Sequence, residues 1–288
     1  MFKSLSPTYK GIFLALIGYS GFAISDTPAK FLTSHYSTLA IVFYIALTAS
    51  IFILALSPLL GGFKKPDKGS IRFHVLRGVM NLSLSLLVVE SLSHLPLATV
   101  YTIIFAKPFI AAILGMIIYH EFVTRQRWTA IALGFAGIVI AMRPSADGID
   151  PALLLPLGAA TCSAIMWVST RSLKGESSFA MGFYAVLVTA LVSLPFLLHD
   201  FVIPAPEHLY LFAISGAGVS AGVIGLSLAF QNAPSAAVSP FHYTQMLWGI
   251  SLGYLVFGDV PDALTMLGAA IIISSGLYLI WARSRERP

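Results

Sequence analysis

The feature that most constrains the fold of this chain is an internal repeat. Four residues of the first half recur at one constant spacing in the second, where Pro96, Ala98, Gly115 and Glu121 correspond to Pro234, Ala236, Gly253 and Asp259. Each copy carries five apolar segments, and because five is odd, the second copy would cross a bilayer in the opposite sense to the first. This is the inverted-repeat plan of secondary transporters, so transport is the leading function.

The composition is that of a polytopic membrane protein, since 57% of the residues are hydrophobic, 10% are charged and the mean hydropathy is +0.87. In the first half, apolar runs of membrane-spanning length cover Tyr9 to Ser25, Leu39 to Ser57, Phe73 to Leu92, Leu97 to Tyr119, and Trp128 to Met142. In the second half they cover Leu153 to Thr170, Phe179 to Leu198, Leu209 to Phe230, Ala236 to Phe257, and Ala263 to Trp281. We predict an all-α integral membrane protein with ten transmembrane helices, in which residues 1–147 form the first five-helix repeat and residues 148–288 form the second, inverted one.

The basic residues predict the orientation, because Lys and Arg favour cytoplasmic loops. With both termini inside, only Lys30 and Arg143 among the loop and terminal basic residues fall on the outer side. This predicts a multi-pass protein of the inner (cytoplasmic) membrane. The net charge of +5 is dispersed over short loops rather than gathered on one water-facing surface, which excludes a nucleic-acid partner. The single Cys162 permits no internal disulfide.

Two strings that imitate enzyme or metal motifs have structural explanations. Gly218-Val-Ser-Ala-Gly222 matches a nucleophile elbow, but that motif needs a strand-to-helix turn, and here it lies in an apolar helical run where glycines allow close helix packing. His120-Glu121 lacks the second histidine of a zinc helix, since Thr124 stands in its place. We expect no enzyme activity, no cofactor and no metal.

Several motifs resemble the EamA family of the drug/metabolite transporter superfamily. They are Leu97-Ala-Thr-Val, Lys107-Pro-Phe, His120-Glu121 and Arg127 to Gly137 in the first half, and Ser239 to Tyr243, Phe257 to Pro261 and Gly268 to Ile273 in the second. The resemblance covers nearly the whole chain. It implies ten helices with both ends cytoplasmic, a central cavity between the repeats, and movement of small organic metabolites by alternating access.

Within that family, three stretches are most similar to bacterial S-adenosylmethionine uptake carriers: Ser25-Asp26 through Lys30, Phe183 to Pro195, and Pro240 to Tyr243. Carriers of this kind often have an arginine in the second span, whereas Phe43 to Leu47 is uncharged here. The chain instead has a lysine in its fourth span.

Lys107 is the main candidate for substrate binding. It follows Pro96 by eleven residues, which places it about 16 Å down a helix and near the middle of a hydrocarbon core about 30 Å thick. A charge there costs about 2.5–3.5 kcal/mol, so Lys107 should be paired or face a water-filled cavity. The candidate partner is Glu90, near the outer end of the third span. The pair would either lock the two helices together or anchor a substrate carboxylate or a coupled proton.

The repeat adds residues at the same depth. Lys107 corresponds to Gln245, Phe105 to Tyr243 and Ile104 to His242, so both related positions would face the repeat interface, where such carriers bind substrate. His242 is either a hydrogen-bonded core residue or a group that takes part in proton coupling. Four aromatic residues are expected either to line the cavity or to serve only in helix packing and in the aromatic belt at the membrane interface. They are Tyr101, Trp167, Tyr184 and Trp248.

Other polar residues receive structural interpretations. Asp26 and Lys30 are one helical turn apart, which predicts a surface ion pair, with a gate at the cavity mouth as the alternative. Arg77 is expected to snorkel to the cytoplasmic interface. Pro108 and Pro240 interrupt spans, either as hinges that free backbone carbonyls or as tolerated kinks.

We therefore expect an alternating-access secondary transporter of small polar or zwitterionic metabolites, amino-acid-like and including S-adenosylmethionine. An exporter of amphiphilic or toxic compounds is the alternative. A channel would need rows of pore-lining polar residues, which these spans lack. No nucleotide-binding loop is present, so the energy should come from a coupling proton, another ion, or exchange against a counter-solute.

Overall fold

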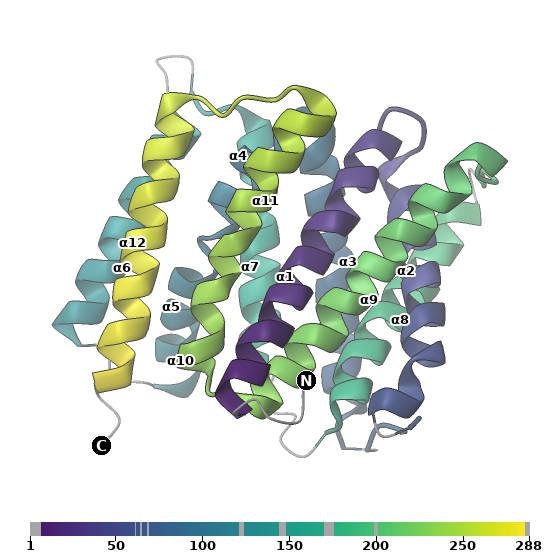
Figure 1. The fold of residues 1–288 in the computed structure, drawn as a ribbon, viewed down its shortest axis with the longest axis horizontal. Coiled ribbons are helices and arrows are strands. Elements are labelled where there is room, and N and C mark those ends of the chain that lie inside the picture. Colours follow the sequence, from purple (N-terminus) through teal and green to yellow (C-terminus); the bar gives the residue numbers. More distant parts are fainter. Residues whose placement is uncertain are drawn as a thin grey trace.

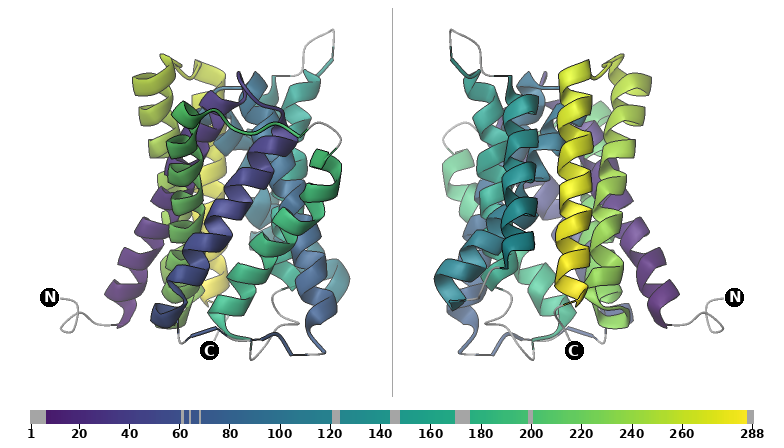
Figure 2. Two further views of the ribbon diagram at one scale, coloured as in Figure 1. Left: turned by 90° about the vertical axis from the view of Figure 1, so that its right-hand side faces the viewer. Right: turned by 90° about the vertical axis from the view of Figure 1, so that its left-hand side faces the viewer.

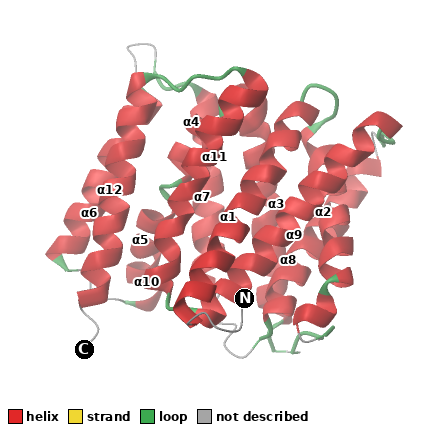
Figure 3. Cartoon of the chain, in the orientation of Figure 1, coloured by secondary structure: helices red, strands yellow, loops and turns green. Residues whose placement is uncertain are grey.

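In the computed structural model, the described residues are 7–60, 62–63, 65–67, 69–120, 124–143, 148–169, 176–198 and 201–285. Their regular structure is helical (Figure 3), as expected. The repeat residue Glu121 and the expected repeat boundary at residue 147 lie outside these ranges.

The long helices run side by side in one bundle (Figure 1). The first half contains α1 (Pro7–Leu32), α2 (Thr38–Ala55), α3 (Ile71–His94), α4 (Leu97–Ile104), α5 (Lys107–Tyr119) and α6 (Arg125–Met142). The second half contains α7 (Leu154–Ser169), α8 (Ser178–Leu197), α9 (Leu209–Asn232), α10 (Ser235–Val238), α11 (Thr244–Leu252) and α12 (Ala263–Arg285). The beginning of α1 and the end of α12 lie at the same end of the bundle (Figure 2).

Two of the expected spans are broken, and prolines account for both breaks. The fourth span ends as α4 at Ile104 and resumes as α5, with Pro108 in the first turn. In the ninth span, a 3₁₀ segment at Ser239–Tyr243 that contains Pro240 separates α10 from α11. Proline lacks the backbone N–H that a continuous helix needs, and it is accommodated where a new helical segment begins.

The expected ten long spans are not all present as single apolar helices. Eight segments of the described chain are long and apolar enough to cross a membrane. The fifth expected span is shorter, because the apolar part of α6 is only Trp128–Met142. The ninth is divided among α10, the 3₁₀ segment, α11 and a π-helical turn at Gly253–Phe257, so no single helix covers it.

The packing repeats between the two halves. Helix α1 lies on α9 as α7 lies on α3, and α2 contacts α8, α4 contacts α11, and α6 contacts α12. Equivalent glycines allow the close approaches. A Cβ on Gly78 of α3 would lie 2.3 Å from Val188 of α8, and one on Gly216 of α9 would lie 2.2 Å from Thr48 of α2. Small residues let helix backbones approach where lipid offers no hydrophobic driving force.

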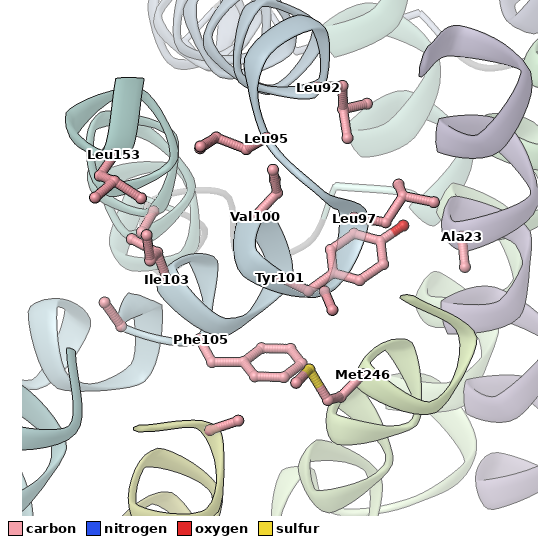
Figure 4. Packing of buried hydrophobic residues seen from close by; sticks show 14 of the residues in the cluster. Ala23, Leu92, Leu95, Leu97, Val100, Tyr101, Ile103, Phe105, Leu153 and Met246 are labelled. Atoms are coloured by element: carbon pink, nitrogen blue, oxygen red, sulfur yellow. The ribbon is translucent and has the colours of Figure 1, made fainter. Parts of the chain in front are cut away.

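The main core lies where the two broken spans meet. Figure 4 shows Tyr101 and Phe105 near Met246 of α11, with Ala23 of α1 beside Tyr101. Phe105 is fully buried, in the short connection between α4 and α5. This core fixes the ends of the half-helices that carry the candidate site residues.

Candidate functional site

One face of α1 packs beside the place where α4 and α11 meet, and its side chains make polar contacts there. Tyr19, Ala23, Asp26 and Lys30 are spaced so that they share this face. The Tyr19 ring lies 5.1 Å from the ring of His242. The Asp26 carboxylate accepts a hydrogen bond of 2.8 Å from the Tyr101 hydroxyl.

Lys107 begins α5 immediately after the break in the fourth span. Its ammonium nitrogen lies 5.3 Å from the ring centroid of Trp167 on α7. Within the described part of the chain, the ammonium has no hydrogen bond and no carboxylate partner. The side chain is half-buried, so its charge is held between helices without a counter-ion from the described residues.

The predicted pair of Glu90 and Lys107 is not formed. Glu90 accepts a hydrogen bond of 2.5 Å from the Thr38 hydroxyl, and its other oxygen lies 3.3 Å from Nε2 of His94. These contacts hold the carboxylate near the end of α3, where its side chain is 44% exposed, whereas Lys107 faces α7. The rotation of α3 about its axis therefore directs Glu90 toward α2.

The residues predicted to correspond to the Lys107 region lie buried at the 3₁₀ break and the start of α11. The ring centroid of His242 lies 4.9 Å from that of Phe105, and Gln245, three residues further along the chain, is also buried. Phe105 precedes Lys107 by two residues, so this ring contact joins the start of α5 to the 3₁₀ segment. Tyr243 is directed toward α12, where its hydroxyl occupies the space beside Gly276.

The four predicted aromatic residues separate into different environments. Tyr101 is buried at the α1 junction, Trp167 lies under the Lys107 ammonium, and the indole N–H of Trp248 donates to the Ser20 hydroxyl at 2.8 Å. Tyr184 lies elsewhere, with its ring 5.4 Å from that of His74 near the start of α3. The structure thus brings together Lys107, Trp167, His242 and Gln245, and places Glu90 and Tyr184 away from them.

The interpretation of Asp26 and Lys30 as a surface pair is wrong. Asp26 is bonded to Tyr101, while the Lys30 ammonium lies 2.5 Å from Asp259 and donates to the Leu95 carbonyl at 3.2 Å. Sequence spacing alone did not predict the contact between Asp26 and Tyr101. The available signal was an acidic residue inside an apolar span.

Arg77, which is expected from the sequence to snorkel to the cytoplasmic interface, contacts a neighbouring helix. Its guanidinium donates a hydrogen bond of 2.9 Å to the carbonyl of Met166, in the last turn of α7. The final carbonyls of a helix lack partners within that helix and attract cations. Arg77 therefore joins α3 to the carboxyl end of α7.

The described residues contain no group of three or more His, Cys, Asp or Glu side chains that could hold a metal ion. The chemistry that the site offers is ionic and aromatic recognition: an ammonium group, a carboxylate with a phenol, an imidazole and two indoles.

Comparison with known proteins identifies the family of this chain. The chain is 28% identical to the S-adenosylmethionine uptake transporter of Rickettsia prowazekii (strain Madrid E), over 99% of this chain and 97% of the relative. It is also 28% identical to the riboflavin transporter of Vibrio cholerae, over 92% and 91% of the two chains. A crystal structure with 14% identity shares the fold, with a TM-score of 0.65 over 98% of this chain and 99% of the other. The model of the EamA-like transporter family matches residues 9–143 and again residues 150–282, and the chain belongs to this family of multi-pass membrane transporters.

Proposed function

We propose that the protein is a secondary active transporter of small zwitterionic metabolites, in which Lys107 binds the substrate carboxylate. The observation that carries this proposal is the ammonium of Lys107, held at the broken fourth span without a hydrogen bond or ion pair to another described residue. A lysine near the bilayer centre costs about 2.5–3.5 kcal/mol. An anionic ligand group would offset that cost.

The names of two relatives support a small metabolite as the substrate. One is named for uptake of S-adenosylmethionine and another for riboflavin. S-adenosylmethionine carries an amino-acid carboxylate and positive charge, whereas riboflavin has no carboxylate. A lysine without an ion pair among the described residues therefore favours a substrate of the first kind, and the Trp167 ring could stack on a planar group beside it.

Alternating access would follow from two inverted five-helix repeats, residues 1–147 and 148–288, with ten crossings in all. The reciprocal packing of α1 on α9 and of α7 on α3 supports this arrangement. So does the position of the beginning of α1 and the end of α12 at the same end of the bundle (Figure 2). The excess of Lys and Arg in the loops at that end favours cytoplasmic termini in the inner membrane. Half-helices near the midplane are the usual binding elements of such carriers.

Ligand binding to the purified protein tests the proposal. A ligand at about 100 times its dissociation constant adds about 2.7 kcal/mol of stability, so S-adenosylmethionine should raise the melting temperature. Replacing Lys107 by Met keeps the length of the side chain and removes its charge. Since hydrogen bonds to charged groups contribute about 1.5–3 kcal/mol, Lys107→Met should weaken binding by about tenfold to a hundredfold.

Lys10→Met is the matched control, because Lys10 is exposed in the first turn of α1. Equal affinities of Lys107→Met and the wild type for S-adenosylmethionine would remove Lys107 from the binding site. Stabilisation by hydrophobic cations alone would favour an exporter of amphiphilic compounds, for which the half-exposed indoles of Trp167 and Trp248 would provide the contact surface.

A further inference from the structure

Asp26 is an intramembrane acid that the carboxylate-binding role of Lys107 does not explain. Building on the proposed function, we infer that Asp26, hydrogen-bonded by Tyr101, is the site that binds the coupling proton of this transporter. Ionisable groups inside membrane segments mark ion pathways and proton relays by default, and here the contacts around the carboxylate identify the ion.

The first step is that no cation among the described residues forms an ion pair with Asp26. It lies six residues before the end of α1, about 9 Å inside the helix end. Its hydrogen-bond partner is the Tyr101 hydroxyl, at 2.8 Å. Lys30, one turn along the same face, is directed instead to Asp259 and the Leu95 carbonyl.

The other titratable groups around α1 do not change this balance. On the 3₁₀ segment, His242 lies beside Tyr19, two turns away from Asp26. On α3, Glu90 is bonded to Thr38 and lies near His94. From the described part of α9, the Ser215 hydroxyl donates a hydrogen bond to the carbonyl of Ser25, next to Asp26. This group is uncharged. The local sum of charges is one uncompensated carboxylate.

The second step is that close packing favours a proton over a larger cation. Tyr101 is 2% exposed, and its ring lies directly on the backbone of Gly249, where a Cβ would be 2.6 Å from the ring. The space beside the Tyr101 phenol is already filled by protein atoms, so an ammonium or sulfonium group would not fit there. A metal cation would need several oxygen ligands, whereas Asp26 and Tyr101 supply the side-chain oxygens here. A proton needs no added volume.

The third step connects this proton to the outer end of the bundle. An ionised Asp26 attracts Lys30, because the two residues are at i and i+4 on one helix face. A proton bound to an Asp26 oxygen gives a neutral carboxylic acid, which leaves Lys30 to Asp259, the arrangement seen in this structure. Proton binding thus favours the contact between α1 and the loop before α12, and proton release weakens it.

Infrared spectroscopy of the purified full-length protein tests the site without any substrate. When the pH is lowered until Asp26 takes up its proton, the wild type should gain a carbonyl band of a protonated carboxylic acid. This band should be absent from Asp26→Asn and shifted in Tyr101→Phe, which loses the hydroxyl donor. It should persist in Asp150→Asn, a control in which the side chain still caps the turn at Ala152. Identical carboxylic-acid bands in Asp26→Asn and the wild type would overturn the proposal.

A second variant guards against misfolding. If Asp26→Asn does not fold, Asp26→Glu should fold and move the band rather than remove it, and an unmoved band would also overturn the assignment. In proteoliposomes, a pH gradient should drive uptake of S-adenosylmethionine by the wild type and have no effect on uptake by Asp26→Asn. A retained gradient response in that variant counts against coupling through Asp26. Failure of the wild type to bind this substrate would instead contradict the proposed function and leave the infrared result to decide the proton site.

Discussion

The ammonium of Lys30 in α1 lies 2.5 Å from the carboxylate of Asp259, in the loop that precedes α12. The same ammonium lies 4.8 Å from the ring centroid of Phe257. Three residues further along this loop, Asp262 pairs with Arg143 at the end of α6. Both acids of the loop are thus bound by basic residues from the first half of the chain. Ion pairs between the two halves hold together the end of the bundle opposite the beginning of α1 and the end of α12.

Lys30→Ala should lower the melting temperature by removing this connection. The side chains of Lys30 and Asp259 are 15% and 27% exposed, between a surface pair worth about 0–1 kcal/mol and a buried pair whose disruption costs about 3–5 kcal/mol. We expect a loss of about 1–3 kcal/mol for either single variant. In a double-mutant cycle with Asp259→Asn, the combined loss should be smaller than the sum of the single losses. Additive losses would show that the two groups do not interact in solution.

Trp167→Leu should weaken ligand binding by removing the ring beneath Lys107. A contact between this ring and a positively charged ligand contributes about 0.5–2 kcal/mol, so the dissociation constant for S-adenosylmethionine should rise by about two- to thirtyfold. Trp167→Phe keeps a weaker ring and should give an intermediate value. Trp128→Leu, at a half-exposed position on α6, serves as the control. The contact has no role in binding if calorimetry gives one dissociation constant for all four proteins.

Gly21→Ala should destabilise the packing of α1 on α9. A Cβ at this position would lie 2.7 Å from the Gly218 carbonyl oxygen and 2.9 Å from the Gly222 nitrogen. Backbone atoms cannot move aside as a flexible side chain can, so we expect a loss of about 1–3 kcal/mol, measured as a lower melting temperature. Gly253→Ala is the helical control, because its nearest neighbours would be 3.7 and 4.0 Å away. Equal melting temperatures of the two variants would contradict the close approach.

Glu176→Gln should reduce stability at neutral pH and have less effect in acid. Burial alone would raise the pKa of the Glu176 carboxyl, but hydrogen bonds from the Ser70 hydroxyl and the Asp67 backbone N–H, with His74 nearby, lower this pKa below its usual range. Because the pKa of Glu176 is lower in the folded protein, its ionised carboxylate stabilises the fold. This stabilisation is complete above the unfolded-state pKa of about 4.3 and is lost as the pH falls through the lower pKa of the folded state.

Melting temperatures of the wild type and Glu176→Gln, recorded from neutral to acidic pH, should therefore converge below about pH 4.3. Glu207→Gln, at an exposed position before α9, should show no such convergence. A difference between the wild type and Glu176→Gln that stayed constant with pH would mean that the charge of Glu176 does not contribute.

The sequence by itself determined the helical architecture, the duplication and the positions of the helix breaks. These features depend on local properties: apolar runs long enough to span a bilayer form helices, and a proline interrupts a helix where it stands. For the same reason, Lys107 and His242 could be placed beside the two breaks from their distance to Pro108 and Pro240 along the chain.

Only the tertiary structure decided which polar groups meet. The sequence predicted pairs of Asp26 with Lys30 and of Glu90 with Lys107. In the folded chain, Asp26 is instead hydrogen-bonded to Tyr101, and Lys30 to Asp259. Glu90 is hydrogen-bonded to Thr38. A side chain's partner depends on the rotation of each helix about its axis and on which helices are neighbours. In a chain that is apolar on nearly every helix face, the hydrophobic pattern does not specify that rotation, and close packing at glycines such as Gly21 and Gly216 specifies it instead.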